Sequence, residues 1–259
     1  MPNSPLPEWD ALLASVAHLR KILPEAVLVG GTAAAIYAHH RVSIDHDHTL
    51  GDLRERFDEV LAQLESVAGW KTARVRRPVL ILGSLDGIET GIRQLIREEP
   101  LETEEVEVGG ARLILPSKAE MLRIKAVLIL KRNATRDYLD TVAMSELLGD
   151  KGTLAALHDF DRLYPQPNGE SPLQQLQIQL ANPMPYDLDD TDLTQYKHLK
   201  TEYQDWDRVK ARCADLAELI LTGPSRGFWY AGKLLARTNA GFAPEDRDHR
   251  HGGNIRTRG

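Results

Sequence analysis

Residues 27–50, which read VLVGGTAAAIYAHHRVSIDHDHTL, constrain the fold more than any other part of the chain. The short apolar run before the double glycine predicts a buried strand, and the alanine-rich run after it predicts a helix that begins at the double glycine. Residues 42–48 then alternate with a period of two, which predicts a second strand. This order of strand, glycine turn, helix and strand indicates a sheet with helices packed on it.

The rest of the chain divides into a part rich in strands and a part rich in helices. Hydrophobic spacing predicts helices over 8–22 and 51–69, and short β-branched runs separated by turn residues predict antiparallel strands or hairpins that extend the sheet over 71–115. Ser117 and Glu120 have the spacing of a capping box and predict the start of a helix over 116–133. Further helices are predicted over 135–148, 151–163, 171–181, 193–221 and 225–238.

The predicted fold class is therefore α+β (α/β), with a mixed sheet flanked by helices and followed by a helical C-terminal domain. We expect an α/β core over 1–115, a helical domain over 116–240 and a flexible tail over 241–259. The tail is expected to be flexible because it is polar and rich in glycine and arginine.

Composition excludes several classes of protein. The net charge of -6 argues against non-specific coating of nucleic acid, although local basic clusters remain, such as Lys71, Arg74, Arg76 and Arg77. The single cysteine, Cys213, excludes an internal disulfide. Apolar runs fall far below the roughly 18 residues that span a membrane, and the first residues lack a signal-peptide pattern. We expect a cytoplasmic protein without a membrane partner.

Two acids, Asp45 and Asp47, stand two residues apart on the strand predicted at 42–48. Their side chains should leave the same face of the sheet, with Cα atoms about 7 Å apart. Carboxylates in this arrangement suit hard divalent cations such as Mg²⁺. His46 and His48 should point to the opposite face, so we expect them to pack against neighbouring structure rather than bind the same metal.

A candidate phosphate cradle, Gly30-Gly31-Thr32, lies between the first strand and its helix. Glycines let the backbone approach a phosphate closely, and the amides of a helix N-terminus and the Thr32 hydroxyl supply donors. A double glycine is common by itself. A double glycine that is followed by Asp-X-Asp on the next strand is a much more specific indication of a phosphate site.

These motifs resemble the signature of the nucleotidyltransferase superfamily, and in particular its AbiEii-type toxin branch of abortive-infection and type IV toxin–antitoxin systems. The resemblance rests on Gly-Gly-Thr followed by Arg41-X-Ser43-X-Asp45-X-Asp47. It continues in a second block that also fits this branch, and together the two blocks cover about residues 25–145. The residues of the second block are Lys125, Arg132, Arg136, Asp137 and Asp140.

The resemblance implies Mg²⁺-dependent transfer of a nucleoside monophosphate from an NTP to a hydroxyl of RNA, such as tRNA, or of a protein. Asp45 and Asp47 would bind metal, with two Mg²⁺ ions, and act with Lys125 in catalysis. A cognate antitoxin would be a further partner. The nucleotide would be bound by Gly30, Gly31, Thr32, Arg41, Ser43, Asp137 and Asp140, where the two last acids orient Lys125 or face the nucleotide or acceptor.

One departure from the family pattern leaves alternatives open. The superfamily commonly has a third carboxylate on a later central strand, and residues 88–96 are the candidate for that strand. Its slot holds Arg93 or Gln94, and the nearest acid is Glu89, whose ordinary interpretation is an exposed hairpin residue. If no third carboxylate is present, the alternative is a degenerate fold that binds nucleotide, RNA or a partner without catalysis. A third hypothesis is a zinc or manganese hydrolase built on the histidines of residues 39–48 together with the two acids.

Overall fold

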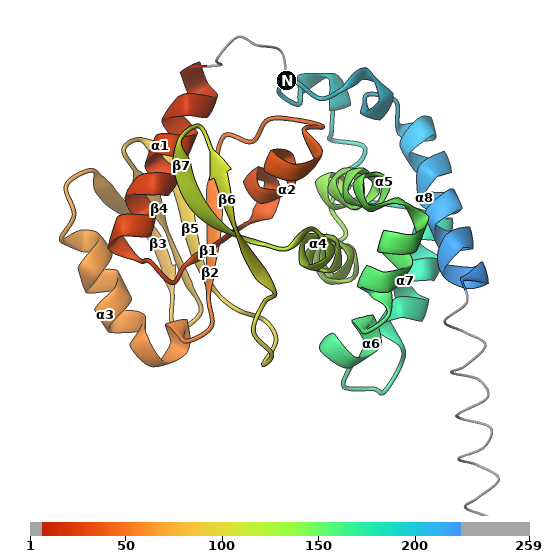
Figure 1. Ribbon diagram of the computed structural model, residues 1–259, viewed down its shortest axis with the longest axis horizontal. Helices are drawn as coiled ribbons and strands as arrows, with labels where there is room; N and C mark the ends of the chain where they lie inside the picture. The colour runs from red at the N-terminus through yellow and green to blue at the C-terminus, as the bar shows by residue number, and fades with distance from the viewer. Residues whose placement is uncertain (1–6, 224–259) are drawn as a thin grey trace, which may run out of the picture. The chain divides into compact units, whose positions relative to one another are not determined.

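The computed structural model describes residues 7–223, and its first half has the predicted strand and helix order (Figure 1). Helix α2 begins at the double glycine, and Gly30 has a positive φ of 77°, a conformation that glycine adopts without steric cost. The elements are α1 (Pro7–Ile22), β1 (Val27–Val29), α2 (Gly30–Ala38), β2 (His46–Leu50) and α3 (Leu53–Glu65).

The strand predicted at 42–48 begins later than expected. β2 starts at His46, so Asp45 precedes the strand and residues 41–45 form an irregular segment. This segment is held by contacts outside the sheet, because the Val42 amide donates to the Lys197 carbonyl at 2.9 Å. Alternating polarity therefore extended the prediction beyond the residues that pair with neighbouring strands.

Three hairpin strands extend the main sheet as predicted: β3 (Trp70–Arg76), β4 (Leu80–Leu85) and β5 (Ile88–Gln94). The strand order is β1-β2-β5-β4-β3, with β2 and β5 parallel and the other neighbouring pairs antiparallel. β6 (Thr103–Val108) and β7 (Ala111–Pro116) form a separate two-stranded sheet rather than an extension of the first. The predicted mixed sheet with flanking helices is confirmed.

One face of the main sheet is closed by helices. Ile81, Leu85 and Ile92 point to this face and pack with apolar side chains of α1 and α3 in a buried cluster. Because side chains alternate along a strand, the residues between them point to the other face. That second face carries Asp47.

The helical part begins with α4 (Lys118–Arg132), whose N-terminus is capped as predicted, because the Ser117 side chain accepts from the Glu120 amide. The next helix, α5 (Thr135–Leu157), continues past its predicted end, although Gly149 interrupts it with non-helical backbone. α4 and α5 pack against α2 in the larger hydrophobic cluster. The helices that follow are α6 (Phe160–Leu163), α7 (Pro172–Ala181) and α8 (Trp206–Thr222).

The helix predicted over 193–221 is only partly present. Residues 193–205 contain two single-turn 3₁₀ helices, Leu193–Gln195 and Thr201–Tyr203, and α8 follows them. Packing explains the difference, since Leu193, Leu199 and Tyr203 are buried in the large hydrophobic cluster. The helix predicted at 225–238 and the tail lie outside the described residues. The domain boundary between 115 and 116 stays a prediction and falls at the end of β7.

Candidate active site

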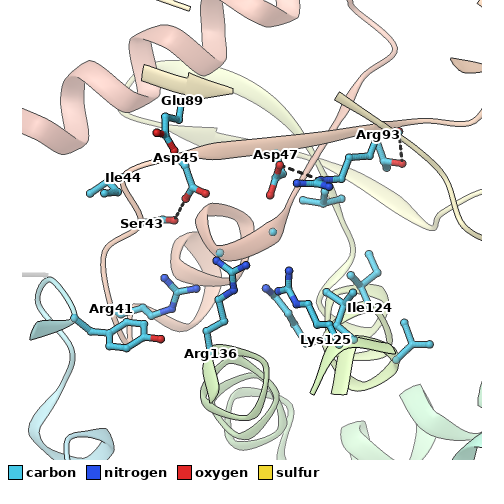
Figure 2. A pocket seen from close by; sticks show the side chains of 18 of the residues that line it. Arg41, Ser43, Ile44, Asp45, Asp47, Glu89, Arg93, Ile124, Lys125 and Arg136 are labelled. Carbon is cyan, nitrogen blue, oxygen red and sulfur yellow. Dashed lines mark hydrogen bonds and ion pairs between the residues drawn. The ribbon is translucent and has the colours of Figure 1, made fainter. Parts of the chain in front are cut away.

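A cavity of about 850 Å³ opens on the Asp47 face of the main sheet (Figure 2). Its lining includes Gly30 and Gly31 at the start of α2, Asp45 just before β2 and Asp47 within it. Cationic side chains from the helical part complete the wall. They are Lys125 and Arg132 of α4 and Arg136 of α5, with Lys197 from the segment before α8.

Asp47 lies between two glycines that leave room for its carboxylate. Its partner in the β2–β5 register is Gly91, and a Cβ at that position would lie 2.2 Å from Asp47 Oδ1. A Cβ on Gly30 would lie 3.4 Å from Oδ2 of the same carboxylate. The glycines of α2 and β5 therefore leave space that a Cβ would take from this carboxylate.

Asp45 is oriented by the irregular segment that precedes β2. The Ser43 hydroxyl donates to Asp45 Oδ1 at 2.7 Å, and the Thr32 hydroxyl donates to the Asp45 backbone carbonyl. Thr32 is buried, and it is not among the cavity-lining residues. The structure thus places Thr32 where it fixes the backbone of an acid.

Arg41 and Lys125 converge on one buried carboxylate, that of Asp140 in α5. Lys125 Nζ lies 2.7 Å from Asp140 Oδ2, while Arg41 donates from Nε at 2.8 Å and from Nη2 at 3.0 Å. His40 Nε2 lies 2.7 Å from Asp140 Oδ1. Burial opposes the charged carboxylate, but Arg41, Lys125 and His40 together hold the pKa of Asp140 well below its usual range.

The second acid of the Arg-Asp block, Asp137, is also buried and paired. Arg132 donates to both of its carboxylate oxygens, from Nε at 2.5 Å and from Nη2 at 2.6 Å. Arg136 extends from α5 toward Asp45 and Asp47, as Figure 2 shows. Asp137 and Asp140 do not line the cavity. They contact the cations of its wall, so of the alternatives left open, the contacts favour orientation of Lys125 by Asp140.

Besides the acid pair, β5 adds two charged side chains to the site, Arg93 and Glu89. Arg93 Nε lies 3.2 Å from Asp47 Oδ1. Glu89 lies on the same strand face, and the cavity lining includes it with both aspartates. Glu89 is exposed, as expected, yet it belongs to the cavity wall and not only to the hairpin turn.

His46 and His48 occupy the opposite face of β2, as predicted from strand alternation. Both are buried, and His46 Nδ1 lies 3.0 Å from His48 Nε2. His46 Nε2 also lies 2.9 Å from Ser15 Oγ of α1 and 3.1 Å from Thr90 Oγ1 of β5. Burial lowers the pKa of His46 to about 4, so this histidine is neutral at pH 7.

The donor set fits magnesium better than zinc. Within residues 7–223, no group of three or more His, Cys, Asp or Glu side chains is arranged to hold a metal ion. Of the histidines in the hydrolase hypothesis, His40 contacts Asp140 and His39 is exposed. His46 and His48 contact each other on the buried face of β2. Mg²⁺ is commonly held by one or two carboxylates, with substrate phosphates and waters as its other ligands. Asp45 and Asp47 meet that requirement.

A segment that precedes α8 also lines the cavity, and no sequence motif predicts this position. Asp190, Thr191, Asp192 and Tyr196 line the cavity, although they lie far along the chain from the motifs. Backbone hydrogen bonds join this segment to the residues before β2, since the Lys200 amide donates to the His40 carbonyl at 2.9 Å. No local pattern in these residues indicates such a position.

Within the described part of the chain, no helix is long and apolar enough to cross a membrane.

No family model matches this chain. Among curated proteins, it is 34% identical over 128 residues to the heme uptake protein MmpL11 of Mycobacterium tuberculosis, and 32% identical over the same length to the mycolic acid-containing lipids exporter MmpL11 of Mycolicibacterium smegmatis. These matches cover 48% of this chain and 13% of each relative. The chain thus spans about an eighth of the length of these relatives.

Solved structures similar to this chain include three described with nucleotidyl transfer. A candidate nucleotidyltransferase from H. pylori is 16% identical, with a TM-score of 0.49 over 85% of this chain and 96% of that one. ANT(2")-Ia in complex with adenylyl-2"-tobramycin is 13% identical, with a TM-score of 0.45 over 60% and 97%. A nucleotidyltransferase-like protein from Paracoccidioides brasiliensis is 14% identical, with a TM-score of 0.41 over 67% and 94%. All three TM-scores are below 0.5.

Proposed function

We propose that this chain is a Mg²⁺-dependent nucleotidyltransferase, which transfers a nucleoside monophosphate from an NTP to a hydroxyl of RNA or protein. One observation carries the proposal: Asp45 and Asp47 line the same cavity as the glycines at the start of α2 and a wall of arginine and lysine side chains. Acids that hold a divalent cation and cations that receive phosphates are the two halves of a phosphoryl-transfer site.

The triphosphate would lie between the start of α2 and the cationic wall. Gly30 and Gly31 let the backbone approach the phosphates, and the helix N-terminus favours negative charge. Arg136 reaches toward the same space, and Lys125 is held in position by Asp140. These cations would stabilise the charge that develops on the leaving pyrophosphate.

In the reaction, the acceptor oxygen forms a bond to the α-phosphorus while the bond from that phosphorus to the pyrophosphate oxygen breaks. Asp45 and Asp47 would hold two Mg²⁺ ions, which activate the acceptor oxygen and neutralise the leaving group when bound. The acceptor hydroxyl must lose its proton. Glu89 lies on the cavity wall beside the acids and is the residue that we assign to accept it.

Nucleotide binding without transfer is the second candidate function. It is favoured by the ion pair between Arg93 and Asp47 and by Gly91 at the register position beside that acid. Because the Arg93 guanidinium occupies Asp47 and position 91 has no carboxylate, the site would bind a nucleotide but would activate an acceptor hydroxyl less well. The toxin-like role and a cognate antitoxin are proposals that rest on the AbiEii-type motifs.

Label transfer tests the proposal directly. The protein is incubated with each α-³²P NTP and Mg²⁺, with total cellular RNA or cellular protein as acceptor. Wild type should transfer label, and Asp45→Asn or Asp47→Asn should abolish transfer, whereas Arg208→Gln on the surface of α8 should not change it. Glu89→Gln should slow transfer but leave NTP binding intact. Wild-type protein that binds NTP and labels neither acceptor would establish the binding function instead.

A further inference from the structure

The sheet face that carries Asp47 continues beyond the cavity to the edge strand β3. The pairing register places Asp47 beside Gly91, Gly91 beside Leu82 and Leu82 beside Arg74. A second row runs from Thr49 through Arg93 and Leu80 to Arg76. Side chains paired across a sheet share one face, so Arg74 and Arg76 point to the same side as the acid pair. Three strand spacings, about 14 Å, separate β2 from β3.

An irregularity in β3 adds a third cation to this face. The pairing with β4 shifts between Thr72 and Arg74, so Ala73 has no partner in the register. Because of this extra residue, Lys71 pairs with Ser84 and shares the face of Arg74 and Arg76. Without the shift, simple alternation would place Lys71 on the opposite side.

The three cations are exposed and available. Within residues 7–223, the side chains of Lys71, Arg74 and Arg76 make no hydrogen bond or ion pair, and their backbones pair within the sheet. Arg77, which follows them, differs: it pairs with Asp58 and lies over the Phe57 ring of α3, on the helix-covered side. Besides Asp47, the described strands place one more acid on the open face: Glu89, at the end near Asp45 (Figure 2). The face is therefore cationic from the edge strand to Arg93.

We propose that Lys71, Arg74 and Arg76 form a docking track for a single-stranded RNA acceptor, whose end reaches Asp45 and Asp47 across the open sheet face. This inference rests on the proposed function and specifies its acceptor. A row of unpaired cations beside a transfer site is complementary to a phosphate backbone. An unfolded protein acceptor has no regular negative charge to match it. Because the net charge is -6, attraction to RNA must come from local cationic clusters such as this track.

RNA binding of the full chain, measured without NTP, tests the track. A fluorescein-labelled single-stranded RNA of mixed sequence is titrated by anisotropy at several NaCl concentrations. The triple variant Lys71→Gln, Arg74→Gln, Arg76→Gln should reduce the slope of log K against log[salt] by about 2, at roughly 0.7 per phosphate contact. If affinities agree at 1 M salt, that change corresponds to about a hundredfold loss at 0.1 M.

The control removes three exposed cations away from this face, in the variant Arg77→Gln, Arg208→Gln, Lys210→Gln. This control variant has the same net charge as the track variant, but its slope of log K against log[salt] should equal that of wild type. Equal slopes in the two triple variants would overturn the track, as would label transfer to protein that is indifferent to the track residues. NTP binding is measured on every variant. If the track variant binds both NTP and RNA like wild type, only the track is refuted. If wild type does not bind NTP but its RNA binding depends on the track residues, only the proposed transferase is refuted.

Discussion

Arg93 Nε lies 3.2 Å from Oδ1 of Asp47, so a guanidinium contacts one of the two acids proposed to bind metal. Both side chains are partly exposed, at 47% and 26%. An ion pair with this exposure contributes about 0.2–1 kcal/mol. A divalent cation can therefore displace Arg93 at modest cost, and the guanidinium then becomes available to a phosphate.

Arg93→Gln should tighten divalent-cation binding, because it removes the competitor for Asp47. The expected change in Mn²⁺ affinity is about 1.4- to fivefold, which corresponds to about 0.2–1 kcal/mol for a partly exposed ion pair. Titration followed by electron paramagnetic resonance measures it, with Arg208→Gln as the control. Weaker Mn²⁺ binding in Arg93→Gln would contradict competition at Asp47.

Gly91→Ala should disrupt the acid pair without unfolding the sheet. The added Cβ would lie 2.2 Å from Asp47 Oδ1, so the carboxylate must move. We expect Mn²⁺ affinity to fall by about tenfold or more, equivalent to about 1.4 kcal/mol, while circular dichroism stays unchanged. Gly51→Ala is the matched control, since a Cβ there meets nothing within 4 Å. Equal Mn²⁺ affinity in the two variants would argue against Asp47 as a ligand.

Asp140→Asn should strongly destabilise the fold. The substitution leaves Arg41 and Lys125 charged and buried without their shared carboxylate, and loss of one partner from a buried ion pair costs about 3–5 kcal/mol. Urea unfolding at neutral pH measures the loss. Asp58→Asn removes an exposed pair with Arg77 and should cost less than about 1 kcal/mol. Similar losses in the two variants would show that Asp140 is not the centre of the network.

Stability should fall as the pH drops below about 6.5, because His46 is buried neutral and burial lowers its pKa to about 4. The unfolded chain binds a proton at this residue between these two values, whereas the folded chain does not. The contribution of His46 is thus complete above pH 6.5 and is lost progressively toward pH 4. Between pH 7.5 and 5 the loss is about 2 kcal/mol.

Urea unfolding at several pH values measures this loss. His46→Gln keeps a polar side chain between Ser15 and Thr90 but does not titrate. Its stability should therefore depend less on pH in this window than that of wild type. Parallel pH profiles for the two proteins would mean that other groups, and not His46, determine the acid sensitivity.

Residues close together in the chain were enough to predict the local elements around the site. The apolar run before Gly30, the alanine-rich helix after it and the alternation around Asp47 each depend on residues close in the chain, and local periodicity records them. The same periodicity placed His46 and His48 on the face opposite Asp47. It also placed the start of β2 too early, since it cannot show which residues find a strand partner.

Tertiary structure decided which distant residues complete the site. Asp140 follows Lys125 by 15 residues and Arg41 by 99, and only the packing of α4 and α5 on α2 brings the three charges together. The register of β5 against β2 placed Gly91 and Arg93, rather than an acid, beside Asp47. The shift in β3 brought Lys71 onto the face of Arg74. Strand register and helix packing depend on contacts between segments far apart in the chain, so no local pattern records them.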